Sequence, residues 1–241
     1  MKKFTSLFTL LFISVAGLFA QAPNVEEIAA TYLENIGGTE AWLAVKSIKS
    51  SGKAAMQGME FPMTMTMAEG DKTRLDVDVQ GQKIIQAYDG ETAWQVMPFM
   101  GITEPTAMSP EEAAQMKDQK FLNEFINSEE RGFVLTAVEG KEVEGAETYG
   151  VKVTNEAEEI EHIYYFDTEY MIPVMMATPV KAGPGKGQMV ETYMSDYKEV
   201  DGLMMATFME VKVAGQTIQK ITLSDFEVNP EIDETMFALP K

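Results

Sequence analysis

The amino-acid sequence predicts a mainly β protein of the α+β class, built on one large antiparallel sheet. In residues 59–67 every second side chain is large and apolar, which is the period of a β-strand with one dry face. About a dozen strand-like segments follow residue 47, separated by turns short enough for hairpins, such as Gly58, Gly81 and Asp89-Gly90. Because flat open sheets of so many strands are uncommon, we expect this sheet to curl or close around its apolar face.

The first predicted element after the N-terminal segment is a helix over residues 24–36. Asn24 can cap it, and Glu27 stands three positions later, at the capping-box spacing. Gly37-Gly38 ends it, and Thr39 begins a short second helix. The apolar stripe of the first helix must be buried, most simply against the sheet that follows.

The predicted strands form two runs. They lie near residues 47–57, 59–69, 72–80, 82–89 and 91–97, and then near 133–140, 147–154, 159–167, 170–178, 187–198, 203–214 and 216–228. The gaps within the first run are short, so its neighbouring strands are expected to pair antiparallel, as a meander.

Residues 98–131 interrupt the strands. Pro98–Ile102 is an apolar loop, and Ser109 then caps a helix with Pro110 at its first position. An apolar face continues beyond that helix, through Phe121 and Ile126, and predicts a second short helix. The pattern fits a lid over a cavity as well as it fits a helix that plugs the sheet permanently.

The N-terminus predicts export. Lys2 and Lys3 precede an apolar stretch of signal-peptide length, and Ala20 offers a cleavage site before Gln21. We therefore expect residues 1–20 to be a signal peptide and residues 21–241 to form a single domain. No later segment is long enough to cross a bilayer, and the absence of cysteine excludes a lipid anchor.

Composition excludes several classes of function. The formal charge of −19 disfavours nucleic acids and anionic membrane surfaces. Without cysteine there is no thiolate nucleophile, no Cys-ligated zinc and no iron–sulfur cluster. His162, the only histidine, is expected to be a packed or surface residue because no catalytic partner is evident. The Gly-rich stretch 183–187 lacks the pattern of a phosphate-binding loop. We expect neither an enzyme nor a cofactor or metal.

The chain is rich in methionine, with 19 such residues. Methionine is unbranched and polarizable, so it adapts to irregular apolar partners and specifies packing poorly. A sheet face rich in methionine therefore suggests a surface that accepts variable apolar shapes, such as acyl chains. An ordinary β-core would give the same composition.

Four segments carry a resemblance to a known family. They are Asn35–Gly38, Tyr88–Trp94 (YDGETAW), Tyr164–Glu169 (YYFDTE) and Ser195–Leu203 (SDYKEVDGL). Together they resemble the outer-membrane lipoprotein-sorting-protein-like family of Gram-negative bacteria, which is similar in fold to the LolA and LolB periplasmic carriers. The resemblance covers most of residues 21–241. It implies a half-open β-barrel whose helices close an apolar cavity, and a periplasmic location.

Three hypotheses follow for function. The first is a periplasmic binder or carrier of lipid or lipoprotein acyl chains, with a cavity that helical residues close. The expected ligand-binding residues are Met59, Phe61, Met63, Met65, Met67, Trp94, Met205 and Met209 along the wall, and Met116, Phe121 and Phe125 in the closing segment. The second is a non-enzymatic interaction or sensor module with a packed barrel, in which the acidic exterior or loop 98–102 binds an envelope protein. An enzyme ranks last.

Overall fold

The computed structural model describes residues 23–56, 58–181 and 185–241. The predicted signal peptide, residues 1–20, and its cleavage after Ala20 lie outside these ranges, as does part of the predicted turn at 183–187. Within these ranges, no helix is both long and apolar enough to cross a membrane.

The described residues contain sixteen strands, more than the dozen that the sequence predicts. The first six are β1 (Ser47–Met56), β2 (Met59–Ala68), β3 (Lys72–Val79), β4 (Gln82–Tyr88), β5 (Ala93–Met97) and β6 (Ile102–Ala107). The others are β7 (Val134–Val138), β8 (Glu142–Val143), β9 (Ala146–Asn155), β10 (Ile160–Asp167), β11 (Pro173–Pro179), β12 (Met189–Ser195), β13 (Lys198–Val200), β14 (Leu203–Met205), β15 (Phe208–Val213) and β16 (Gln216–Val228).

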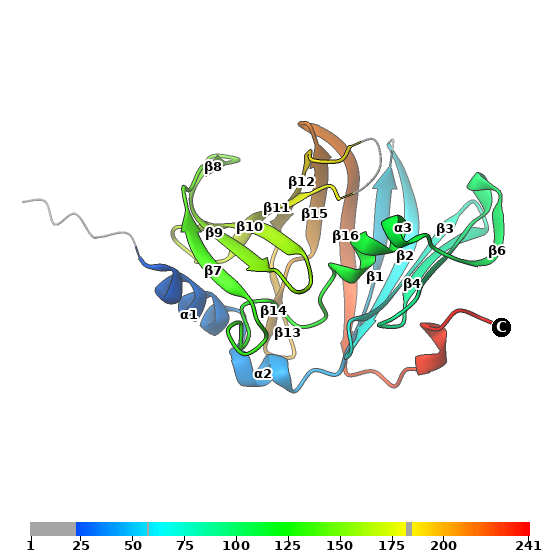
Figure 1. Ribbon diagram of the computed structural model, residues 1–241, viewed down its shortest axis with the longest axis horizontal. Coiled ribbons are helices and arrows are strands. Elements are labelled where there is room, and N and C mark those ends of the chain that lie inside the picture. Colours follow the sequence, from blue (N-terminus) through cyan, green and yellow to red (C-terminus); the bar gives the residue numbers. More distant parts are fainter. Residues whose placement is uncertain (1–22, 57, 182–184) are drawn as a thin grey trace, which may run out of the picture.

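Fourteen of these strands form one antiparallel sheet that curls into an open half-barrel (Figure 1). Its order is β6-β5-β4-β3-β2-β1-β16-β15-β12-β11-β10-β9-β7, and β8 pairs with β9. The pairing of β1 with β16 joins the two halves of the chain side by side. Strands β6 and β7 stand at opposite ends of the order, so the sheet does not close. The predicted mainly β fold with a strongly curved antiparallel sheet is confirmed.

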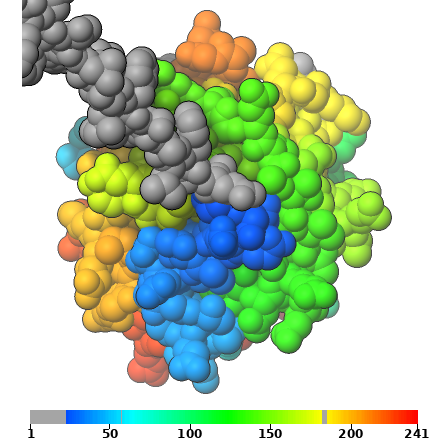
Figure 2. All heavy atoms as spheres, turned by 90° about the vertical axis from the view of Figure 1, so that its left-hand side faces the viewer, coloured from blue at the N-terminus to red at the C-terminus, as the bar shows by residue number. Residues whose placement is uncertain are grey.

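Three α-helices accompany the sheet in the described residues: α1 (Val25–Asn35), α2 (Thr39–Leu43) and α3 (Pro110–Lys117). Two short 3-10 helices, η1 (Pro98–Met100) and η2 (Glu234–Met236), follow β5 and β16. The capping boxes of α1 and α3 form as expected, because the side chains of Asn24 and Ser109 accept hydrogen bonds from the backbone N–H groups of Glu27 and Glu112. In Figure 2, α1 and α2 (blue) lie between the green segment that includes β7 and the orange β13–β14 hairpin.

The helices cover two separate parts of the concave face of the sheet. Helix α1 packs on β9 and β10, where Tyr32 meets Val151 and Phe166 in one buried cluster. Helix α3 packs on β4 and β5, where Met116 meets Tyr88. Neither α1 nor α3 packs on the concave face between these two regions.

Two of the segments that resemble the known family, Asn35–Gly38 and Ser195–Leu203, are distant in sequence but meet in space. Gly37, at the end of α1, lies against the backbone of Gly202, in the turn between β13 and β14. A Cβ atom at Gly37 would approach the Gly202 carbonyl oxygen to 2.2 Å, and Gly37 has a φ of +109°. The Met204 N–H donates to the Ile36 carbonyl at 3.1 Å, which ties the hairpin to the helix end. These contacts therefore join the end of α1 to the β13–β14 hairpin.

The chain differs from the prediction at several places, and β8 and β13 are two short strands that were not predicted as separate elements. No helix forms over residues 119–126; this segment consists of turns, because the Arg131 guanidinium donates to the carbonyls of Leu122, Asn123 and Ile126. Residues 102–107, expected in the interruption, form edge strand β6. The predicted strand 203–214 is broken into β14 and β15, where the Thr207 hydroxyl donates to the Asp196 carbonyl at 2.6 Å.

Candidate binding cavity

A cavity of about 1170 Å³ occupies the hollow of the half-barrel. Its floor comes from the concave faces of β1, β2, β10–β12, β15 and β16, and its roof from α2, α3 and residues 118–124. Seven methionines line it: Met65, Met67, Met176, Met194, Met204, Met205 and Met209. This volume is slightly above the usual range of ligand pockets, so the cavity is large enough for a long apolar ligand.

Five of the residues that the sequence singles out line this cavity. Met65 and Met67 come from β2, Met205 from β14, Met209 from β15, and Phe121 from the roof. The strand break at Ala206-Thr207 means that Met205 and Met209 reach the cavity from different strands. Met176, Met194 and Met204 also line the cavity but were not expected there. The segments of Met176 and Met194 show no methionine alternation, and the alternation in 203–214 puts Met204 on the face opposite Met205.

Three further residues of β2 share the face of Met65 but do not line the cavity. Phe61 and Met63 are buried in a cluster with Val77 and Leu223, from the neighbouring β3 and from β16. Met59 is the first residue of β2, and 51% of its surface is exposed. The cavity therefore lies along only one end of the alternating strand.

Two residues of the expected closing segment pack away from the cavity. Met116 is buried against Tyr88 and Ala93 on the inner side of α3. Phe125 makes edge-to-face contacts with Tyr32 and Phe166, with ring centroids 5.3 and 5.4 Å apart. Both side chains hold the roof segments onto the sheet.

Trp94 lies on the opposite, convex face of the sheet. In the register it pairs with Ala87, which pairs with Arg74, and the Arg74 guanidinium is 5.6 Å from the indole centroid. The indole N–H donates to the Phe237 carbonyl at 2.7 Å, so the C-terminal segment covers it. In β3, polar side chains such as Arg74 alternate with apolar ones. Trp94 lies on the same face as Arg74 in the register, and this face is outside the cavity.

A buried polar cluster stands in the cavity wall. The Glu124 carboxylate, on the roof segment, lies 2.7 Å from Nδ1 of His162 on β10, and these side chains are only 4% and 7% exposed. The Tyr164 hydroxyl donates to the other Glu124 oxygen at 2.7 Å. Burial, and then the neighbouring Glu124 charge, raise the pKa of Tyr164, so its phenol is a proton donor at neutral pH. His162 is thus a packed residue, as expected, but one with an acidic partner.

The sequence does not predict this cluster, because Glu124 and His162 come from separate elements. No local spacing relates an acid in a turn to a histidine in a strand. Tyr164 did carry a signal, since it follows His162 by two positions and must share its strand face. Nearby, the Asn123 amide donates to the Tyr32 hydroxyl, and the Tyr197 hydroxyl donates to the Pro173 carbonyl at 2.6 Å.

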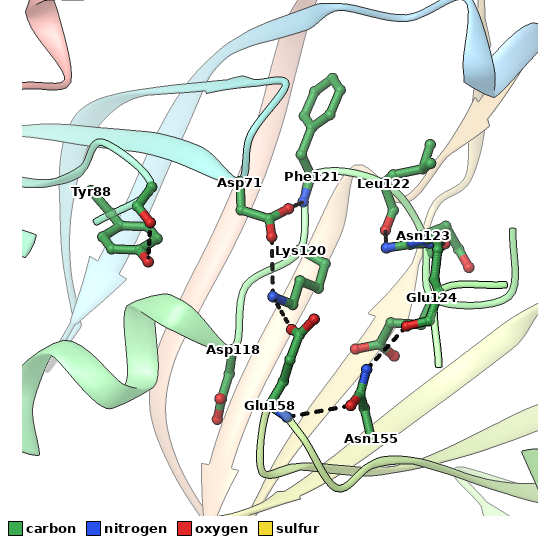
Figure 3. Close-up of polar contacts among 12 residues, drawn as sticks. Asp71, Tyr88, Asp118, Lys120, Phe121, Leu122, Asn123, Glu124, Asn155 and Glu158 are labelled. Atoms are coloured by element: carbon green, nitrogen blue, oxygen red, sulfur yellow. Dashed lines mark hydrogen bonds and ion pairs between the residues drawn. The ribbon is translucent and has the colours of Figure 1, made fainter. Parts of the chain in front are cut away.

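Ion pairs fasten the roof segment across the hollow (Figure 3). Lys120 Nζ lies 3.0 Å from Asp71, in the β2–β3 turn, and also contacts Glu158, in the β9–β10 turn. The Phe121 N–H donates to Asp71 at 3.1 Å. Burial opposes the Lys120 charge, but its bonds with Glu158 and Asp71 outweigh that effect and raise the pKa of the ammonium. One lysine therefore links the two halves of the curved sheet, and we call these contacts the Lys120 latch.

The acidic residues give no metal centre in the part of the chain that the structure describes. There, no group of three or more His, Cys, Asp or Glu side chains is arranged to hold an ion. A smaller cavity of about 500 Å³ adjoins the latch, between α2 and Arg131, and it shares Trp42, Lys120 and Phe121 with the larger one.

Comparisons with known proteins identify the fold. No family model matches the sequence, and no curated protein matches it either. A LolA superfamily protein from Nitrosomonas europaea is similar in structure, with a TM-score of 0.56, 10% identity, and coverage of 90% of this chain and 98% of that chain. A putative outer membrane lipoprotein-sorting protein domain from Vibrio parahaemolyticus gives a TM-score of 0.54 at 13% identity, over 87% and 97% of the two chains.

A DUF1329 family protein from Desulfovibrio piger is also similar, with a TM-score of 0.55 at 13% identity, over 89% of this chain and 97% of that chain. All three likenesses extend along nearly the whole of the solved chains. They confirm the LolA-like half-open barrel that the resemblance implied. At such low identity the likeness identifies the fold, and function has to be argued from the cavity.

Proposed function

We propose that this chain is a periplasmic binding or carrier protein for lipid or lipoprotein acyl chains, and that it works without catalysis or a cofactor. The methionine-lined cavity of about 1170 Å³ is the observation that carries the proposal. Apolar burial stabilises a bound chain by about 0.8 kcal/mol per methylene, so a long acyl chain needs few polar contacts. We further propose that residues 21–241 form one domain and are exported after removal of residues 1–20.

A second candidate is an envelope interaction module. The apolar turn between β5 and β6 favours it, since Phe99 is 57% and Met100 is 70% exposed there. Exposed apolar side chains on a loop are typical of a contact surface. The open cavity, however, supports ligand binding over the packed barrel that this candidate requires.

Native mass spectrometry of residues 21–241, purified from a periplasm without detergent, tests the proposal. We expect added mass that corresponds to a lipid or acyl chain and that is lost on denaturation. A chain that stays without ligand, even after incubation with phospholipid vesicles and fatty acids, would contradict the proposed function.

A pair of variants on adjacent residues of β16 tests the cavity itself. Ile221 lines the cavity, whereas Thr222 is exposed on the opposite face, opposite Lys53 of β1. Ile221→Glu puts a charge into the apolar cavity, so acyl-chain uptake is expected to fall tenfold or more. Thr222→Glu adds the same charge outside and should leave uptake unchanged. Met65→Glu should repeat the loss from β2. Equal uptake by all three folded variants would contradict the site.

A further inference from the structure

The Glu124–His162 pair is an unusual wall for an apolar cavity. Both side chains are nearly fully buried, and both line the cavity together with Tyr164. Burying a carboxylate is costly unless it is paired, and apolar residues of the same volume often stabilise a fold equally well. A carboxyl group paired with an imidazole at this position therefore suggests a role beyond packing.

The pair has hydrogen-bonding capacity that the protein does not use. An ionised carboxylate offers about four acceptor positions, and Tyr164 occupies one of them on Glu124. Nδ1 of His162 is close to Glu124 but is not aligned for a hydrogen bond, and it has no other partner among the described residues. A ligand group that donates a hydrogen bond to Glu124 would use this capacity.

The cations around the cavity are already committed. Lys120 is bound by Asp71 and Glu158, and the Lys181 ammonium lies 2.7 Å from Asp118. The acidic lining consists of Glu111, Glu112, Asp118 and Glu124. A ligand carboxylate or phosphate at Glu124 would therefore add a second acidic group where both lining lysines already have acidic partners, which disfavours binding.

We propose, on the basis of the proposed lipid-binding function, that Glu124 and His162 form a head-group subsite. This subsite selects lipids whose polar end is uncharged and carries a hydroxyl or amide N–H donor. Glu124 accepts the hydrogen bond, Tyr164 holds the carboxylate in place, and the acidic surroundings exclude anionic head groups. The cavity methionines bind the chain, and the Glu124–His162 subsite distinguishes one polar end from another.

Three ligands that share the oleoyl chain test this selectivity. These are 1-monooleoylglycerol with hydroxyl donors, oleamide with amide donors, and oleate with a carboxylate. Their dissociation constants are measured on residues 21–241 by displacement of a fluorescent acyl probe. We expect at least one of the neutral ligands to bind about tenfold or more tightly than oleate, since a hydrogen bond to a charged group commonly contributes that much. The neutral ligand with the lower dissociation constant shows whether Glu124 prefers a hydroxyl or an amide as the hydrogen-bond donor.

Substitutions test whether Glu124 causes the selectivity. Glu124→Gln keeps the shape but removes the charge, so the preference over oleate should fall to about threefold or less. Glu130→Gln is the control, because Glu130 is exposed and does not line the cavity, while its substitution changes the net charge equally. Its ratio of dissociation constants should equal that of the wild type, whereas a purely structural role of Glu124 would weaken all three ligands equally.

The outcomes separate the two proposals. If no oleoyl ligand binds the wild type, the proposed function fails and the inference fails with it. If oleate binds as tightly as both neutral ligands, only the head-group selectivity is overturned. The wild-type ratio decides this even where Glu124→Gln does not fold, and an unchanged ratio in a folded Glu124→Gln would overturn the role of Glu124.

Discussion

The Lys120 latch gives a quantitative prediction about the roof of the cavity. Lys120 contacts acids in two turns that belong to different halves of the curved sheet, and it carries Phe121 with it over the cavity. The Lys120 side chain is 12% exposed, whereas Asp71 and Glu158 are 34% and 43% exposed. Replacing Lys120 by methionine removes both ion pairs and leaves the acids able to regain water.

The magnitude follows from this partial exposure. An exposed ion pair contributes about 0.2–1 kcal/mol. Two pairs to one largely buried ammonium are therefore expected to contribute about 1–2 kcal/mol together, because the exposed acids keep the energy well below that of a buried pair. That energy corresponds to a 5–30-fold change in the population of the open roof.

Hydrogen exchange of the peptide that covers residues 118–124 measures this opening. In Lys120→Met we expect exchange to accelerate 5–30-fold there, with little change in β1 and β16. Lys117→Met is the control, since Lys117 is exposed in the last turn of α3 and its loss changes the net charge equally. Unchanged exchange of residues 118–124 in Lys120→Met, or equal acceleration in both variants, would refute the latch.

The remaining predictions concern stability. Phe237 is fully buried where the C-terminal segment covers Trp94, so Phe237→Ala should lower the free energy of unfolding by about 3–5 kcal/mol in urea titrations; a loss under 1 kcal/mol would contradict this contact. Burial raises the pKa of Tyr32, Tyr164 and Tyr197, so their neutral forms stabilise the fold fully below pH about 10 and lose this contribution as the pH rises further. Absorbance titration should show these phenols ionising only with alkaline unfolding, and early ionisation of all tyrosines would contradict their burial.

Features set by local sequence were predictable. The capping boxes at Asn24 and Ser109 form because each depends on residues three positions apart. The alternation in 59–67 likewise set the common face of Met63, Met65 and Met67. It did not set which of them reach the cavity, because that depends on the strands beside them. Val77 and Leu223 bury Met63, whereas the hollow opens beside Met65.

Features set by distant pairs were not predictable from one sequence. Glu124 meets His162 because a turn, shaped by Arg131, lies over β10, and no local spacing encodes that contact. The same turn replaces the expected second helix after α3. Trp94 was expected in the cavity, but it lies on the convex face. Its face follows from cross-strand register, because Trp94 pairs with Ala87 and Ala87 pairs with Arg74.

The roof also distinguishes a lid from a permanent plug, which the sequence pattern left open. A helix that fills the hollow would turn its apolar residues toward the floor methionines. Helix α3 instead buries Ala113 and Met116 against β4 and β5 and presents Glu111, Glu112 and Gln115 to the cavity. Polar side chains do not pack against methionines without cost, so this helix covers the rim of the hollow. The polar side of α3 therefore leaves the space over the floor open, which supports the proposed apolar ligand.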